Sequence, residues 1–269
     1  MRAISSRSVV MTAVAVAVLG ASVVVLRGQT AHTPPDFSGV YRPMNAFGPP
    51  AGGRAAAPAQ PRPAPGQPLP PPTRTAPLSD GSRGRSPDAP QLTPEYLAKW
   101  QAISKARVAG DTSSDNTAKC LPPGMPAMMN MAYGMEVMQT KDKITFFSEL
   151  NDALRRVYLD GRKPTQAILD DPTYAGYSTG QWEGDTLVVE TVALRGNSYI
   201  EGFSPHSDQM TVHERIRFIE NGILEDTITV TDPKALVKPW TTVKRYRKAA
   251  KGDDQLREFA CAEGIEHAR

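Results

Sequence analysis

Apolar and polar side chains alternate with a period of two over residues 133–269, in short runs that end at glycine-containing turns. In 211–219, for example, Val212, Ile216 and Phe218 fall on one side of an extended chain. A period of two is that of a half-buried β-strand, and several short strands joined by tight turns are typical of a sandwich or barrel. No helix alternates with these runs, which speaks against a parallel sheet. The pattern predicts a mainly β fold, a single antiparallel β-barrel over 133–269.

Nine strands are expected in this region, each bounded by polar or glycine residues. They lie near 133–140, 143–149, 154–159, 176–182, 185–193, 210–219, 223–230, 240–247 and 255–261. A further strand, the first in the chain, is expected within 32–48.

The N-terminal segment 1–31 has the composition of a targeting sequence. Arg2 and Arg7 precede an uncharged apolar run, Val9–Leu26. Its length lies between that of a signal peptide and that of a membrane-spanning helix. Two outcomes stay open: cleavage after Ala31, or a retained N-terminal anchor. Either one predicts an exported protein, periplasmic or anchored facing the periplasm, that meets the membrane only through this segment.

The charge balance argues against a nucleic-acid partner. The chain has 31 basic and 28 acidic side chains, and three of the basic ones, all Arg, lie in residues 1–31. Without that segment 28 basic residues face 28 acidic ones. Neutralising phosphates requires a basic face, which a chain with no net charge does not indicate.

Two segments lie between the first strand and the barrel. Residues 49–91 are rich in proline, cannot bury enough apolar surface to fold, and are predicted to be disordered, as a spacer or a partner motif. Residues 92–132 are predicted to hold one helix and a methionine-rich loop. Thr93 suits the N-cap, Pro94 the first helical position, and Gly110 the end of the helix.

Six methionines fall within a short stretch: Met125, Met128, Met129, Met131, Met135 and Met138. Thioethers suit Cu(I), so a copper-binding envelope protein is one hypothesis. Core packing is the other, because methionine fills irregular gaps. No His or Cys lies among them, and we assign neither a metal site nor a cofactor.

Cys120 and Cys261 are the only cysteines. In an oxidising compartment such a pair indicates one disulfide, which would tie the start of the β region to its last strand. Two separate buried thiols are the alternative.

The hairpin at Gly222 carries the most informative side chains. A two-residue loop would set apolar side chains of one strand opposite polar ones of the other, whereas a three-residue loop with Gly222 left-handed matches them. The favoured register sets Phe218 opposite Leu224, Ile216 opposite Asp226, and Glu214 opposite Ile228.

This register points Glu214 and Asp226 into the barrel as diagonal neighbours. Two inward carboxylates are costly unless paired or solvated, and desolvation with mutual repulsion raises at least one pKa. One interpretation is structural: each acid forms an ion pair with an inward arginine such as Arg156. The other is a functional cavity in which the two carboxyls act as an acid–base pair.

The remaining candidates surround this pair. His206, in a loop beside the same strand, is a possible third acid–base group, with a solvated or capping role as the alternative. A ligand in the barrel would contact Arg156, Ile216, Phe218 and Ile228.

Several segments together resemble a family of exported bacterial proteins of unknown function. The matching motifs are Asp36–Val40, Cys120–Gly124, Gln139–Thr140, Arg155–Arg162, Pro172–Tyr174, Gly180–Val189, Pro205–Ser207, Glu214–Arg215 and Asp232–Pro233. The most specific part is Trp-Glu-Gly-Asp-Thr-Leu-Val-Val at 182–189. The resemblance implies an exported β-rich domain and supplies no activity.

A second resemblance concerns the first strand. Gly39-Val40-Tyr41 resembles the Gly-x-Trp opening of lipocalin-like barrels, with tyrosine in place of tryptophan. It implies that Tyr41 packs under the barrel against a basic residue of the last strands, Arg245 or Arg247.

Four functions follow in order. The first is an exported lipocalin-like barrel that binds a small, largely apolar ligand. The second is a cofactor-free isomerase, hydratase or lyase that uses Glu214, Asp226 and His206. The third is the copper-binding protein, and the fourth is an interaction domain with a solid core. A roomy cavity with clustered polar groups would favour the enzyme, whereas one arginine neutralising each acid in a filled core would exclude it.

Overall fold

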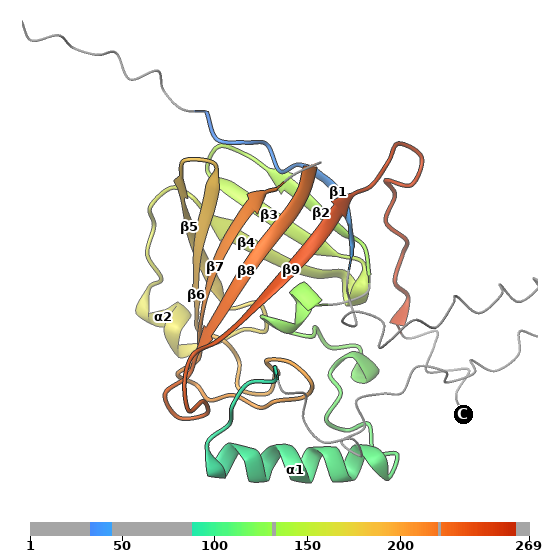
Figure 1. Cartoon of the computed structure of the whole chain (residues 1–269), viewed down its shortest axis with the longest axis vertical. Coiled ribbons are helices and arrows are strands. Elements are labelled where there is room, and N and C mark those ends of the chain that lie inside the picture. Colours follow the sequence, from blue (N-terminus) through green and yellow to red (C-terminus); the bar gives the residue numbers. More distant parts are fainter. Residues whose placement is uncertain (1–32, 45–87, 131–132, 220–221, 262–269) are drawn as a thin grey trace, which may run out of the picture. The chain divides into compact units, whose positions relative to one another are not determined.

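The chain folds into a closed β-barrel. The computed structural model describes residues 33–44, 88–130, 133–219 and 222–261. Nine strands follow one another around the barrel in chain order, and the last pairs with the first (Figure 1). The structure confirms the predicted single, mainly β barrel.

The elements have the following bounds. The strands are β1 (Gly39–Pro43), β2 (Met135–Gln139), β3 (Lys143–Ser148), β4 (Ala153–Tyr158), β5 (Tyr177–Glu183), β6 (Thr186–Val192), β7 (Thr211–Phe218), β8 (Ile223–Thr231) and β9 (Trp240–Lys248). The helices are α1 (Pro94–Val108) and α2 (Gln166–Asp170), with 3-10 turns η1 (Thr117–Lys119), η2 (Ala127–Asn130) and η3 (Leu150–Asp152).

One strand pair departs from the antiparallel pattern. β4 and β5 are parallel and pair only through Val157 with Ser178 and Tyr158 with Thr179. Parallel neighbours need a long connection, and residues 159–176, which include α2, supply it. The first four residues of β4 therefore have no register partner on β5.

The β7–β8 hairpin has the register that apolar matching predicts. Phe218 pairs with Leu224, Ile216 with Asp226, and Glu214 with Ile228. Gly222 is left-handed, with φ +66°, and the Ile219 amide donates to the Ile223 carbonyl at 2.8 Å. Residues 220 and 221 lie outside the described part of the chain.

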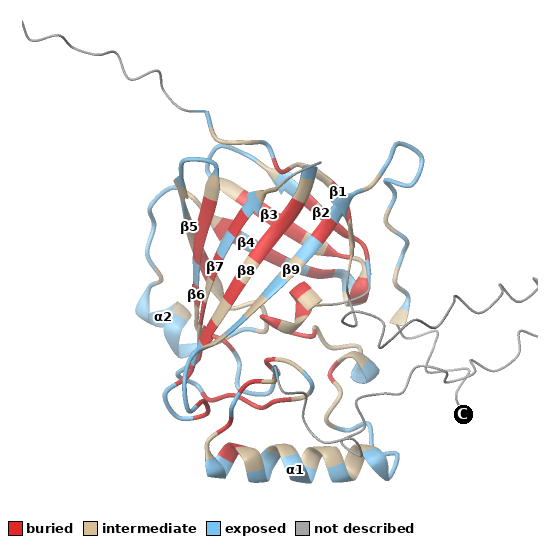
Figure 2. Cartoon of the chain, viewed as in Figure 1, coloured by how far each residue is buried: buried red, intermediate tan, exposed pale blue. Residues whose placement is uncertain are grey.

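Burial alternates along β4 and along β7, as Figure 2 shows for β7. At the end of the barrel that holds the β5–β6 and β7–β8 turns, the Phe37 ring packs against Trp182 and Phe218, each with ring centroids 5.1 Å apart. From η2, Met129 joins the core, and its carbonyl accepts a hydrogen bond from the Tyr246 hydroxyl. Aromatic and methionine side chains thus fill the space that the strands enclose.

The predicted helix is α1. Pro94 occupies its first turn, and the Thr93 hydroxyl donates to the Lys234 carbonyl rather than capping the helix. Trp100 donates from its indole nitrogen to the Gly202 carbonyl at 3.0 Å, while Tyr96 is buried. These contacts attach α1 to the loops around Gly202 and Lys234.

The disulfide between Cys120 and Cys261 is present. The last predicted strand, 255–261, is wrong: the structure has no strand in this segment. The physical reason is barrel closure. Because β9 pairs with both β8 and β1, no open edge remains for another strand.

The expected contact of Tyr41 with a basic residue is also wrong. Tyr41 is buried, and its hydroxyl donates to the Phe37 carbonyl at 2.9 Å. Arg245 instead pairs with Glu225, and Arg247 is exposed.

In the described part of the chain no helix is long and apolar enough to span a membrane. The predicted targeting segment 1–31 and residues 49–87 of the proline-rich insert lie outside the described residues.

Candidate functional site

A polar row crosses the inner wall of the barrel on five neighbouring strands. Arg155 on β4, Ser178 on β5, Thr191 on β6, Glu214 on β7 and Asp226 on β8 are all buried. Strand alternation places each side chain inward, because inward and outward residues differ by one position. The two predicted carboxylates are therefore part of a larger cluster.

Arg155 is the centre of the cluster, and each of its three nitrogens is engaged. Nε donates to Ser178 Oγ at 3.1 Å, and Nη2 donates to Thr191 Oγ1 at 3.0 Å. The guanidinium also binds both carboxylate oxygens of Glu214, with Nη1 at 2.8 Å from Oε1. Such a two-point ion pair fixes both side chains. Four of the five N–H donors of Arg155 are therefore used within the cluster.

The prediction that Arg156 points into the barrel is wrong. Arg156 is exposed, and Arg155 faces the interior instead. The reason is the parity of β4, where Ala153, Arg155 and Val157 share the buried face. The apolar Val157 was the signal that could have identified Arg155, because residues two apart lie on one face.

Asp226 lies diagonal to Glu214 and is fully buried. Neither of its carboxyl oxygens accepts a hydrogen bond from another described side chain or backbone group. Burial, followed by repulsion from Glu214, raises the pKa of Asp226 well above its usual value. Lys244, its register partner on β9, lies with Nζ 3.4 Å from Glu201 Oε2. The surroundings of Asp226 therefore favour its protonated form, whereas Glu214 beside it is ion-paired with Arg155.

The free energy of unfolding of the wild type is expected to fall as the pH rises, and Asp226→Asn is expected to abolish this fall. The folded pKa exceeds the unfolded one, so the folded state holds its proton while the unfolded state releases it above about pH 4. Stability then falls by about 1.4 kcal/mol per pH unit until the folded pKa is reached. In urea unfolding at pH 4 to 8, the free energy of unfolding of Asp226→Asn minus that of the wild type should increase with pH. Asp171→Asn, at an exposed position, is the control and should show no such increase. Parallel curves for wild type and Asp226→Asn would contradict the assignment.

His206 belongs to a different cluster. It is buried rather than solvated, and burial lowers its pKa below 6.5. Its Nδ1 lies 2.8 Å from the Ser207 carbonyl, and because a carbonyl only accepts, Nδ1 carries the proton. Nε2 then accepts from the Ser198 hydroxyl at 2.8 Å. Ser207 in turn donates to Asp232. The structure does not bring His206 to Glu214 and Asp226, and sequence reasoning missed Ser198.

Of the predicted ligand-lining residues, the three apolar ones belong to the core, whereas Arg156 is exposed. Ile216 and Ile228 are fully buried, and Phe218 packs against Phe37. Of the methionines, Met125, Met128, Met129 and Met135 also lie in the core, whereas Met138 is exposed on β2. The described thioethers therefore do not share one surface, and Met131 lies outside the described residues. Among the described residues, His, Cys, Asp and Glu form no group of three or more that could hold a metal.

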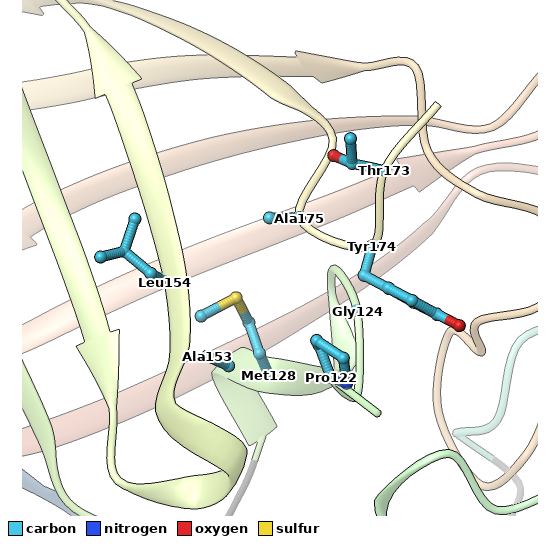
Figure 3. Close-up of a pocket in the computed structure, with 8 residues that line it drawn as sticks. All are labelled: Pro122, Gly124, Met128, Ala153, Leu154, Thr173, Tyr174 and Ala175. Atoms are coloured by element: carbon cyan, nitrogen blue, oxygen red, sulfur yellow. The ribbon is translucent and has the colours of Figure 1, made fainter. Parts of the chain in front are cut away.

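A partly open cavity of about 230 Å³, the wall cavity, lies beside the unpaired half of β4 (Figure 3). It is lined by Pro122, Gly124, Met128, Ala153, Leu154, Thr173, Tyr174 and Ala175. The divergence of β4 from β5 leaves a gap in the wall that segments 122–128 and 173–175 border. None of these residues was singled out as a ligand contact from the sequence.

Several polar groups of the residues that line the wall cavity are hydrogen-bonded to other parts of the protein. The Tyr174 carbonyl accepts from the Met125 amide at 2.9 Å, and the Thr173 hydroxyl donates to the Gly176 carbonyl at 3.3 Å. The Tyr174 hydroxyl accepts from Asn197 Nδ2 at 3.1 Å. What remains for a ligand is mainly apolar surface.

The protein is a closed β-barrel with a buried ion pair, Arg155–Glu214, in its interior and an apolar cavity in its wall. No protein-family model and no curated protein matches the sequence. Among solved structures, a mutant of the fluorescent protein UnaG is 18% identical, covers 43% of this chain and 70% of its own, and has a TM-score of 0.26. A second UnaG mutant is 17% identical, covers 51% and 87%, and has a TM-score of 0.28. Both similarities are too low to transfer a ligand or an activity.

Proposed function

We propose that this protein binds a small, largely apolar molecule in the wall cavity. The observation that carries the proposal is the cavity itself, an apolar space of about 230 Å³ open on one side. Ligand sites are typically concave and apolar with few polar groups, and about 300–1,000 Å³ is usual for drug-sized ligands. The size supports a ligand below that range.

The barrel interior is less suited to this role than the wall. Arg155 forms an ion pair with Glu214. Asp226 is surrounded by buried side chains such as Ile216, Leu224 and Ile228. Both carboxylate oxygens of Glu214 bind Arg155, and neither Glu214 nor Asp226 lines the wall cavity. The acid–base enzyme hypothesis therefore has less support than ligand binding.

Export remains part of the proposal. It is supported by the basic and apolar composition of residues 1–31 and by the disulfide Cys120–Cys261, since disulfides persist in oxidising compartments. We propose that the ligand is met outside the cytoplasm.

Ala175→Trp is expected to abolish ligand binding, because the new indole fills the wall cavity while the half-buried site can accommodate it. Native mass spectrometry of the protein isolated from its producing cells should show a small-molecule adduct that this variant lacks. Ala98→Trp, on the exposed face of α1, is the matched control and should retain the adduct. An adduct that persists in Ala175→Trp would overturn the proposed site.

A further inference from the structure

The size of the wall cavity limits its occupant. An engineered apolar cavity of about 150 Å³ binds benzene. The wall cavity, at about 230 Å³, therefore has room for a substituted single ring or a small fused pair of rings. A long-chain lipid would extend far beyond it.

The charge of the lining limits the occupant further. None of the eight lining residues is Asp, Glu, His, Lys or Arg. Beyond Ala153 the next inward residue on β4 is Arg155, whose donors serve Glu214, Ser178 and Thr191. Arg195 contacts the Tyr174 ring but does not line the cavity, and its Nε donates to the Pro172 carbonyl. A charged ligand would lose its hydration without gaining a counter-charge, which is unfavourable.

The Met128 side chain favours an aromatic ring over a saturated one. Figure 3 shows the Met128 sulfur beside Leu154, whereas the Tyr174 side chain extends away from both. A thioether makes contacts with an aromatic ligand that a saturated ring of equal size does not receive. Such contacts are worth roughly a two- to tenfold difference in affinity.

We infer that the wall cavity selects a small, uncharged aromatic molecule, with Met128 as the residue that recognises the ring. This inference rests on the proposed function and names the ligand class of the same cavity. Met128 lies in η2 and is held by a hydrogen bond from its amide to the Gly124 carbonyl at 2.8 Å. Met125, three residues before Met128, donates from its amide to the Tyr174 carbonyl, which ties the two segments that border the cavity to each other.

Three probes that share a six-membered ring and one substituent test the inference: benzyl alcohol, cyclohexylmethanol and benzoate. Their dissociation constants at pH 7 are measured on the full mature protein by ligand-detected NMR titration. Benzyl alcohol is expected to bind roughly two- to tenfold more tightly than cyclohexylmethanol and at least about tenfold more tightly than benzoate. Equal or tighter binding of either comparison probe would overturn the inference.

Two variants test separately the preference for an aromatic ring and the discrimination against a charged ligand. Met128→Leu conserves volume, so it should reduce the preference for benzyl alcohol while leaving cyclohexylmethanol nearly unchanged. Ala175→Lys adds a cation at the cavity and should bring a gain in benzoate binding that wild type lacks. Unchanged selectivity in both variants, with circular dichroism confirming that they fold, would contradict the assigned roles.

The outcomes also distinguish this inference from the proposed function. If Ala175→Trp removes a native adduct that proves to be charged or non-aromatic, the cavity binds ligands and the inferred class is wrong. If Ala175→Trp leaves the binding of every probe and adduct unchanged, the wall cavity is not a ligand site and the proposed function itself fails.

Discussion

Replacing Arg155 with methionine is expected to lower the free energy of unfolding by about 3–5 kcal/mol, the usual effect of removing one partner of a buried ion pair. The variant leaves the Glu214 carboxylate buried beside Asp226 without a counter-charge, and it removes donors to Ser178 and Thr191. The change is measured by urea unfolding at pH 7.

The adjacent position provides a matched control. Arg156→Met alters the same residue type one position along β4, but its side chain is exposed, so the free energy of unfolding should change by less than about 0.5 kcal/mol. The double variant Arg155→Met with Glu214→Met should recover much of the lost stability, since an apolar pair can replace a buried ion pair. Similar effects of Arg155→Met and Arg156→Met would contradict the inward placement of Arg155.

Replacing both cysteines by serine is expected to lower the free energy of unfolding by about 4–5 kcal/mol in the chain-entropy model. The disulfide joins residues 141 positions apart, so it restricts the unfolded chain strongly. Denaturant unfolding of the oxidised wild type and of the Cys120→Ser, Cys261→Ser variant measures the difference.

A reductant separates this effect from local damage by the serines. Reducing the wild type should bring its unfolding midpoint to that of the double variant, whereas the double variant should not respond. A midpoint that is the same for oxidised and reduced wild type would show that the disulfide contributes no net stability.

The ion pair and the disulfide stabilise different parts of the fold. Arg155 connects β4 to β5, β6 and β7 within the barrel. The disulfide attaches the segment after β9 to the loop that precedes η2. Near that segment Arg42 donates to the carbonyls of Asp253 and Gln255. The C-terminal stretch is therefore held by covalent and polar links rather than by strand pairing.

Local periodicity determined much of the fold. The period-two pattern identified the strands of the barrel, and the Thr93-Pro94 pair located the start of α1. The β7–β8 register was predictable because a slip by one residue would turn Ile216 and Phe218 to the wrong face. The inward direction of Glu214 and Asp226 followed from the same argument.

The partners of those carboxylates depended on which face of β4 is buried. The sequence suggested Arg156 as the inward arginine, whereas the structure sets Arg155 on the buried face with Val157. Only a tertiary structure shows that Arg155 spans from β4 to Glu214 on β7, because the contact crosses two intervening strands. The same holds for His206, whose partner Ser198 lies in another turn of the loop region.

The amino-acid sequence by itself determined the strand pattern, the hairpin register and the cysteine pair available for a disulfide, because these depend on residues that are near in sequence or few in number. The tertiary structure decided the closure of β9 on β1, the parallel contact of β4 with β5, and the wall cavity that results from it. Strand order around a barrel and the space between diverging strands depend on long-range packing, which local side-chain periodicity does not encode.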